Sequence, residues 1–342
     1  MKFLIAGCIV LMTHATAQGQ STLTVPTTVE ATGEPLTLRL RVQPGTLYRS
    51  TMNLNVKSST LANSRTTQKF EMTQQMTFGY DMRVSSVDGF GAATIDTTFR
   101  SVKLQMLFPD GKMAYDSTRP LKRPAGKISP LEEGEMVFGQ LMGAFVGTPY
   151  RTKLSPNGEV WALEGLDKIA NKMVKSVKLS DPRQQAEVQQ IMAGMDKQMF
   201  NPETAKKMAG TKGFYPQAPV RVGDKWNEVA SLISLGVPTA MNTTYALQDR
   251  RNGIATLSLQ GTIRSNSGQK KGSQKSSIAL DSSYTQKGFA KIEENTGWPL
   301  YNEVELRGIT KTQYSTATAT TPITSTTHTL TTMKYVTTKI TP

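Results

Sequence analysis

The sequence predicts an α+β protein in which a large curved antiparallel β-sheet packs on a central group of amphipathic helices. Two observations support this class. Apolar and polar residues alternate through the first and last thirds of the chain, whereas apolar residues recur at helical spacing in the middle. We therefore expect one β-rich domain over residues 35–342, with an N-terminal β half at 35–116, a helical middle at about 131–210 and a C-terminal β half at 215–342.

The N-terminal half contains two stripes of apolar residues that share one parity, which is typical of half-buried strands. The first stripe is Leu36, Leu38, Leu40 and Val42. The second is interrupted only by Gln74. Its members are Phe70, Met72, Met76, Phe78, Tyr80, Met82 and Val84. Between the stripes, the polar stretch from Ser58 to Thr67 predicts a hairpin loop.

The middle of the chain changes to helical spacing. Glu132 to Val146 and Gly165 to Leu179 both carry apolar residues on one helical face. Between them, the Pro156-Asn157-Gly158 turn predicts a short pair of strands. Asp181-Pro182 and Asn201-Pro202 each place a capping side chain before a proline, so they predict two further helix starts.

The C-terminal half returns to alternation and ends in a Thr-rich tail, whose composition favours a last strand. It also resembles the N-terminal half weakly. The parallel segments are Val42-x-x-Gly45-x-x-Tyr48 with Val220-x-x-Gly223-x-x-Trp226, and Ala93-Thr94-Ile95 with Ala255-Thr256-Leu257. These parallels indicate either two pseudo-duplicated halves or the turn chemistry that β meanders share by chance.

The N-terminus carries the pattern of a secretory signal peptide at residues 1–17. Lys2 gives a positive start, an apolar run extends from Phe3 to Met12, and Ala15-Thr16-Ala17 has the small residues that a signal peptidase reads. The run is shorter than the roughly 20 residues that span a bilayer. We therefore expect cleavage near Ala17, export to the periplasm or cell surface, no transmembrane segment, and a flexible lead at 18–34.

Cys8 lies inside this signal, where Leu4-Ile5-Ala6-Gly7-Cys8 matches a lipobox. The apolar run continues past Cys8, so we expect cleavage and not lipidation. Cleavage would remove the only cysteine of the chain. The remaining chain of about 320 residues is long enough to bury a full core without disulfides.

The formal net charge is +14, from 40 Lys and Arg against 26 Asp and Glu. In an exported protein this balance favours contact with an anionic envelope component such as lipid head groups or polysaccharide. Scattered basic residues that serve solubility are the alternative. The candidate contacts are Lys122, Arg123, Arg250 and Arg251. No nucleic-acid-binding motif is recognisable, so nucleic acid is not an expected partner.

The residue types of common active sites are scarce. After cleavage His328 would be the sole histidine and no cysteine would remain, which argues against zinc sites and Ser-His-Asp triads. Two carboxylate groups, Glu132-Glu133-Glu135 and Glu293-Glu294, could serve glycoside hydrolysis, although a helix start and a strand end explain them. We expect no enzyme activity, no metal and no cofactor, and an unrecognised carboxylate-based hydrolase is the third interpretation.

Seventeen methionines occur in the chain, many of them on the apolar stripes. Methionine repacks easily and suits adaptable apolar pockets, although an ordinary core explains the same residues. A curved sheet over amphipathic helices could hold a lipid between them. The candidate lining residues are Met72, Met76, Phe78, Met82, Met106, Met192, Met195 and Met199.

Two short motifs resemble those of an uncharacterised family of exported bacterial proteins, a domain of unknown function. They are Val220-Arg221-Val222-Gly223-Asp224-Lys225-Trp226 and Asn295-Thr296-Gly297-Trp298-Pro299-Leu300. The resemblance covers most of the mature chain and implies no activity. The order of strands, helices and strands is also similar to periplasmic lipoprotein and lipid carriers, half-barrels closed over helices around an apolar cavity, which is an analogy of fold.

These observations predict a non-enzymatic envelope protein that binds an apolar ligand such as a lipid or acyl chain. The alternative is a structural or interaction protein of the envelope, filled by its own side chains, whose basic surface meets an anionic partner.

Overall fold

One 12-stranded antiparallel sheet dominates the computed structural model, which describes residues 32–63, 67–120, 129–177, 214–234, 237–267, 276–316 and 323–340. The strand order is β7-β6-β4-β3-β2-β14-β13-β12-β11-β10-β9, with β5 paired to β4. The strands are β2 (Leu47–Asn63), β3 (Thr67–Val87), β4 (Ala93–Phe108), β5 (Gly111–Asp116), β6 (Pro149–Leu154), β7 (Val160–Glu164), β9 (Lys225–Ser234), β10 (Val237–Arg251), β11 (Ile254–Asn266), β12 (Ser276–Glu293), β13 (Pro299–Thr316) and β14 (Ile323–Ile340). The predicted fold class is confirmed.

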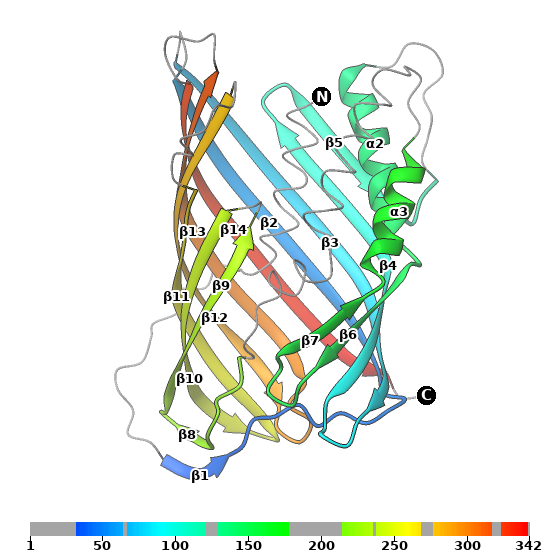
Figure 1. Ribbon diagram of the computed structural model, residues 1–342, viewed down its shortest axis with the longest axis vertical. Coiled ribbons are helices and arrows are strands. Elements are labelled where there is room, and N and C mark those ends of the chain that lie inside the picture. The colour runs from blue at the N-terminus through cyan, green and yellow to red at the C-terminus, as the bar shows by residue number, and fades with distance from the viewer. Residues whose placement is uncertain are drawn as a thin grey trace.

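The sheet curves into an open half-barrel (Figure 1). The last strand, β14, pairs with β13 on one side and with β2 on the other, so it joins the N-terminal and C-terminal strands into one sheet. Among the described strands, β7 and β9 are the two ends of this order, and β5, which pairs with β4 alone, is a further edge. A separate two-stranded sheet, β1 (Thr32–Leu36) with β8 (Val220–Val222), lies at the lower end in Figure 1.

Helices α2 (Pro130–Phe145) and α3 (Leu166–Ser176) occupy the predicted helical middle. A capping box starts α2, because Ser129 Oγ accepts from the backbone N–H of Glu132 at 3.3 Å and Glu132 Oε2 accepts from the N–H of Ser129 at 2.7 Å. The two helices pack on the concave side of the sheet as part of one apolar cluster, here called the helix core. Its sheet residues are Leu54, Val56, Met76, Val102, Leu104, Met106, Met113 and Met333, and its helix residues include Val137, Phe138, Leu141, Met142, Ile169 and Met173. The predicted helix starts at Asp181 and Asn201 lie outside the described residues.

A second apolar cluster, here called the end core, fills the lower end of the half-barrel. Its main members are Leu36, Leu38, Leu40, Val42, Tyr48, Val84, Ile95, Leu247, Leu257, Ile292 and Trp298. The first predicted strand is therefore only partly right, because β1 ends at Leu36. The rest of that stripe is an extended connection whose backbone N–H groups bond to two turns, from Leu40 to Pro156 O and from Arg41 to Thr296 O, both at 2.7 Å.

The hairpin predicted at Ser58–Thr67 is present between β2 and β3, but its loop is shorter than predicted. Strand β2 continues to Asn63 and β3 begins at Thr67, so most of these polar residues pair in the sheet. Strands as long as β2 and β3 can contain polar side chains because these side chains form hydrogen bonds with one another between neighbouring strands. Thr60 and Thr327, for example, share a hydroxyl hydrogen bond of 2.9 Å between β2 and β14.

The two β halves share the same backbone hydrogen bonds at their first turns. The N–H of Gly45 donates to Val84 O and the N–H of Gly223 donates to Leu247 O, both at 2.8 Å. In each case the acceptor residue's own N–H bonds back to the residue after the glycine, at 2.9 and 3.0 Å. Both glycines have positive φ, +84° and +98°. The aligned sequence motifs therefore form one repeated structure.

The repeat extends through the strands that follow. Register shifts occur after Val84 in the β3–β4 pair and after Leu247 in the β10–β11 pair, and these two residues lie opposite Ile95 and Leu257. Similar shifts recur in the β6–β7 and β12–β13 pairs. The equivalent strands are β2 and β9, β3 and β10, β4 and β11, β6 and β12, and β7 and β13. This agreement favours internal duplication over chance.

The duplication also shows why the sheet stays open. In the C-terminal half the fifth strand, β13, is followed by β14, which pairs onward to β2. In the N-terminal half the fifth strand, β7, is followed by helix α3. The N-terminal half therefore lacks a described strand equivalent to β14, and β7 remains an edge.

Gln74 is the polar interruption of the long β3 stripe, and its side chain is fully buried. Among the described residues, its Oε1 has no hydrogen-bond partner and its Nε2 donates to the sulfur of Met76 at 2.9 Å. Because a buried unpaired amide is costly, we expect Gln74→Leu to raise the free energy of unfolding by about 1–2 kcal/mol. Urea denaturation would measure it. Gln75→Leu, on the exposed face, is the control and should change little; a loss of stability in Gln74→Leu would contradict the prediction.

Candidate functional site

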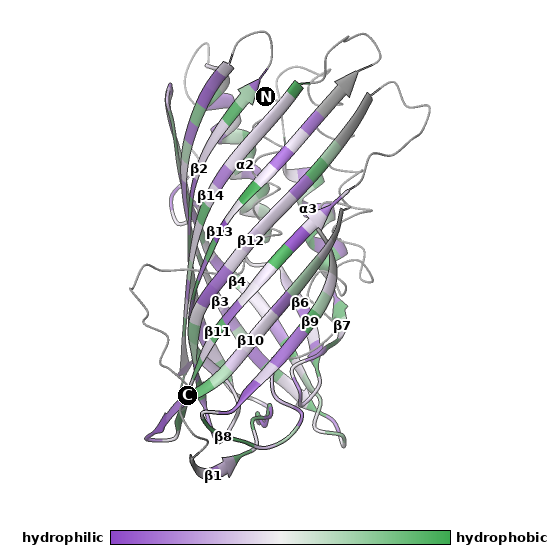
Figure 2. Ribbon diagram, turned by 90° about the vertical axis from the view of Figure 1, so that its left-hand side faces the viewer, coloured by the Kyte–Doolittle hydropathy of each residue, from purple (hydrophilic) through white to green (hydrophobic). Residues whose placement is uncertain are grey.

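The two faces of the sheet differ in charge. On β2, β3, β4, β11, β12 and β13, the described residues that share a face with the helix core and end core include no Asp, Glu, Lys or Arg. The opposite, convex face carries the ion pairs, including Arg49 with Asp81 at 2.9 Å and Arg307 with Glu305 at 2.6 Å. Figure 2 faces the convex side of β10–β13 and shows hydrophilic residues along each strand. The concave face is therefore the uncharged face.

The concave face is uncharged without being wholly apolar. Tyr80, Tyr150 and Tyr335 lie on it between the helix core and the end core, with the hydroxyls of Ser50 and Thr337 beside them; these five residues are here called the tyrosine cluster. Ser50 Oγ donates to Tyr335 Oη at 3.3 Å and lies 2.8 Å from Thr337 Oγ1. The rings of Tyr80 and Tyr335 lie 6.2 Å apart. The cluster places hydroxyl groups on an otherwise apolar surface.

The three tyrosines are sheltered from bulk water. Burial is the largest cause that raises the pKa of Tyr80, of Tyr150 and of Tyr335 above the usual value for tyrosine. Each of them nevertheless keeps part of its surface accessible. The cluster is therefore neutral at physiological pH and is only partly covered by the described residues.

Aromatic rings extend this surface toward the helices. Phe99 lies at the centre, with ring-centroid distances of 6.1 Å to Phe78, 5.6 Å to Tyr80, 5.8 Å to Phe145 and 6.1 Å to Tyr150. These rings come from β3, β4, the end of α2 and β6. Edge-to-face and tilted contacts of this kind stabilise an aromatic group beyond its buried area.

The predicted methionine lining residues do not lie together in one pocket of the structure. Met76 and Met106 are buried inside the helix core, and Met72 and Phe78 are half-buried against it. Met82 packs on the end core. The remaining candidates, Met192, Met195 and Met199, lie outside the described residues. The described candidates thus share the concave face, and two of them are fully packed.

The predicted basic contacts are also separated. Arg250 forms a two-point ion pair with Glu294, its Nη2 2.8 Å from Oε2, and donates to Glu34 O at 2.7 Å, so it supports the fold. Arg251 is largely exposed and pairs with Asp249 at 3.0 Å. Lys122 and Arg123 lie outside the described residues.

Sequence reasoning did not single out the tyrosine cluster as a site. Tyr80 was visible as part of the methionine stripe and Tyr335 as an apolar residue of the Thr-rich tail. The parity of its stripe predicts that Tyr80 faces inward, whereas the apolar residues of the tail have mixed parity and predict no face for Tyr335. Their meeting depends on the pairing of β14 with β2, which places Tyr335 opposite Met52. No sequence signal fixes that pairing.

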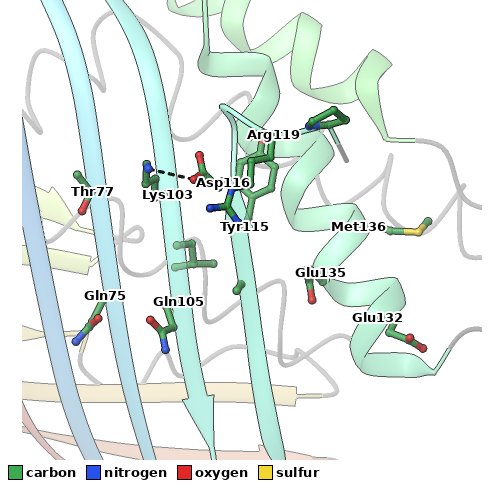
Figure 3. A pocket seen from close by; sticks show the side chains of 13 residues that line it. Gln75, Thr77, Lys103, Gln105, Tyr115, Asp116, Arg119, Glu132, Glu135 and Met136 are labelled. Carbon is green, nitrogen blue, oxygen red and sulfur yellow. Dashed lines mark ion pairs between the residues drawn. The ribbon is translucent and has the colours of Figure 1, made fainter. Parts of the chain in front are cut away.

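A hollow of about 650 Å³ lies between the outer side of β3–β5 and the start of α2 (Figure 3). Gln75 and Gln105 lie opposite each other on its floor, and Lys103 pairs with Asp116 at 3.0 Å. Glu132 and Glu135 of α2 form another wall, where Glu132 is already engaged in the capping box. Five charged side chains line the hollow, so it suits an apolar ligand less well than the uncharged concave face does; they are Lys103, Asp116, Arg119, Glu132 and Glu135.

Asp116 in this hollow supports a pH prediction. It accepts from the backbone N–H and hydroxyl of Thr118 and pairs with Lys103, and these contacts lower its pKa to about 2. Because the folded pKa lies below the unfolded value of about 3.9, the stabilisation is present above pH 4 and lost as the pH falls toward 2. Since Lys103 is half-exposed, we expect Asp116→Asn to cost only about 1 kcal/mol at pH 7.

The measurement is urea denaturation of both proteins between pH 7 and pH 2. The difference between Asp116→Asn and the unchanged chain should shrink toward zero at the acid end. A difference that is constant across this range would show that the ion pair and hydroxyl contacts of Asp116 do not carry its contribution.

Among the described residues, no helix has the length and hydropathy needed to cross a membrane, and no group of three His, Asp or Glu side chains could hold a metal ion. The fold and its faces define the class: an antiparallel half-barrel with an uncharged concave face and helices packed on it. Residues 91–299 match the model of a family described as a family of unknown function (DUF6263). The match spans more than half of the chain, so the chain belongs to this family. No curated protein matches the sequence.

Several solved structures are similar to the chain at low identity. One, reported for lipid–protein interactions in lipovitellin, has 11% identity and a TM-score of 0.39 over 88% of this chain and 26% of that chain. An outer membrane channel from Pseudomonas putida F1 has 5% identity and a TM-score of 0.21 over 87% and 97%. The chain thus spans about a quarter of the lipovitellin chain. At these TM-scores the likenesses carry no structural argument.

Proposed function

We propose that this chain is an exported, non-enzymatic protein of the cell envelope that binds an apolar ligand, such as a lipid or acyl chain, on the concave face of its sheet. The observation that carries this proposal is the division of charge between the faces. A chain with 66 charged side chains, 40 basic and 26 acidic, places none on the described concave face of six strands. A surface without charge and with half-buried aromatic and methionine side chains favours apolar ligands.

The two other interpretations have less support on the described surface. Arg250 is occupied by Glu294, so it is not free for an anionic partner. For a hydrolase, Glu132 Oε2 accepts from the N–H of Ser129, and this contact lowers its pKa, whereas a general acid needs a raised one. Glu293 accepts from the hydroxyl of Thr296. These carboxylates serve helix and turn structure.

Export is part of the proposal and has its own support in the signal pattern of residues 1–17. We expect the protein isolated from the envelope to begin at Gln18, which intact-mass measurement would detect. A mass that includes residues 1–17, or a lipid-modified Cys8, would contradict cleavage at Ala17.

The test of binding is native mass spectrometry of the protein purified from its own envelope, followed by organic extraction. We expect a stoichiometric lipid to co-purify. The control is the same chain produced in the cytoplasm without residues 1–17, which should take up the lipid only when it is added. A clean mass for the exported protein, and no uptake by the control, would overturn the proposal.

A further inference from the structure

The concave face is polar in a particular way: its polar groups are neutral hydroxyls and amides that bond to one another across strands. The paired groups are Ser50 with Thr337 at 2.8 Å, Thr60 with Thr327 at 2.9 Å, Thr239 with Ser265 at 2.8 Å, Tyr284 with Thr310 at 2.7 Å, and Gln286 with Thr243. These hydrogen-bonded pairs lie beside the apolar helix core and end core. The face therefore offers both apolar contact and neutral hydrogen-bonding groups.

The concave rows of the described sheet strands place no cation beside the tyrosine cluster, and the ammonium of Lys172 on α3 already donates to Val146 O at 3.0 Å and to Thr148 Oγ1 at 2.9 Å. On β14 the concave positions from Ser325 to Thr337 are uncharged, and Lys339 follows only at the exposed end of the strand. On the edge strand β9 the acidic Glu228 accepts from the hydroxyl of Tyr245 at 3.0 Å. A carboxylate or phosphate moved onto this face would lose its hydration without gaining a counter-charge, which disfavours its binding there.

Asn302 supplies a neutral acceptor next to the tyrosine cluster. It lies directly opposite Tyr335 on the concave side of β13, and its buried Oδ1 has no hydrogen-bond partner in the described part of the chain. A buried acceptor without a partner is rare and costly. A hydroxyl or amide N–H would satisfy this oxygen by donating to it, whereas an ionised carboxylate has no proton to donate.

We infer that the ligand is a neutral amphipathic lipid, whose uncharged hydroxyl, ester or amide group lies against Tyr80, Tyr335 and Asn302 while its acyl chain follows the apolar concave surface. This inference rests on the proposed function and narrows it. Lipids with a free carboxylate or a phosphate are excluded from the same position by desolvation.

The test compares two probes that share one acyl chain, glyceryl mono-oleate and oleate, by native mass spectrometry and by competition at pH 7.5. We expect glyceryl mono-oleate to bind the delipidated protein at least about tenfold more tightly than oleate. Tyr335→Phe should reduce the difference between the two probes. Tyr301→Phe, on the convex face, is the matched control and should leave both affinities unchanged.

A gain-of-function variant keeps the test informative if the tyrosine variants bind poorly. Met52 is half-buried, faces inward and lies opposite Tyr335, so Met52→Lys supplies the missing cation beside the cluster. We expect oleate to bind Met52→Lys at least about tenfold more tightly than it binds the unchanged chain. Thr51→Lys points outward and should show no such gain. Circular dichroism establishes that the variants are folded.

The possible results distinguish the inference that the ligand is a neutral lipid from the proposed lipid-binding function. Tighter binding of glyceryl mono-oleate, together with the oleate gain in Met52→Lys, supports the inference. Equal or tighter binding of oleate by the unchanged chain overturns the inference and leaves the proposed lipid-binding function standing. Binding of neither probe, with no lipid in the protein from the envelope, overturns both.

Discussion

Replacement of Gly297 by alanine is expected to lower the free energy of unfolding by about 3 kcal/mol or more. Gly297 lies in the Asn295–Trp298 turn with φ of +69°, and a Cβ there would lie 2.0 Å from Arg39 O. The turn also accepts the backbone N–H of Arg41 through Thr296 O, and Tyr215 donates its hydroxyl to Gly297 O. An added methyl group must therefore push the connection of residues 37–42 away from the end core.

A matched glycine separates the close contact from backbone strain. Gly253, in the β10–β11 turn, has φ of +73°, but a Cβ at that position would meet no atom of the described residues within 4 Å. Gly253→Ala should cost only about 1–2 kcal/mol, the penalty of a left-handed conformation. Urea denaturation followed by far-ultraviolet circular dichroism measures both. Equal losses in the two variants would show that residues 37–42 do not pack on the turn in solution.

The fold class could be predicted from the sequence because alternation and helical spacing are local properties of the chain. The stripe from Phe70 to Val84 became β3, and the helical spacing from Glu132 to Val146 became most of α2. The hairpin predicted at Ser58–Thr67 is present, but its loop was predicted too long because polarity was taken as the sign of a loop. In these long strands, threonine and serine hydroxyls form hydrogen bonds between neighbouring strands, as Thr60 of β2 and Thr327 of β14 do. A polar stretch therefore does not mark the end of a strand.

The candidate site could be predicted only in part. The alternation of apolar and polar residues predicts that Met76, Met106 and Tyr80 share the inner side of the sheet, and all three lie on its concave face. The tyrosine cluster needs β2, β3, β6 and β14 together, and Tyr335 is 255 positions from Tyr80 in the chain. Pairing between strands so far apart is decided by assembly of the whole sheet, which local patterns do not encode. The two turn motifs that carried the family resemblance are explained by packing at the end core.

The second large effect is expected at Trp298, which is 3% exposed and stacks on Tyr48 with ring centroids 3.9 Å apart and planes 5° from parallel. Trp298→Ala removes the largest side chain of the end core, so we expect it to lower the free energy of unfolding by about 3–5 kcal/mol. The control is Trp161→Ala on β7. Trp161 is 41% exposed, and its removal should cost less than about 1 kcal/mol.

Tyr48 provides a second readout that does not depend on total stability. Burial and the nearby Glu293 raise its pKa to about 12. Loss of the stacked indole in Trp298→Ala should let water reach the phenol, and the pKa of Tyr48 should then fall toward 10, as followed by absorbance of tyrosinate during alkaline titration. If the end core collapsed onto the vacated space, the stability loss would be small and the pKa would stay high. That result would mean that the lower end of the half-barrel is held chiefly by the backbone bonds of residues 37–42 and not by the Tyr48–Trp298 stack.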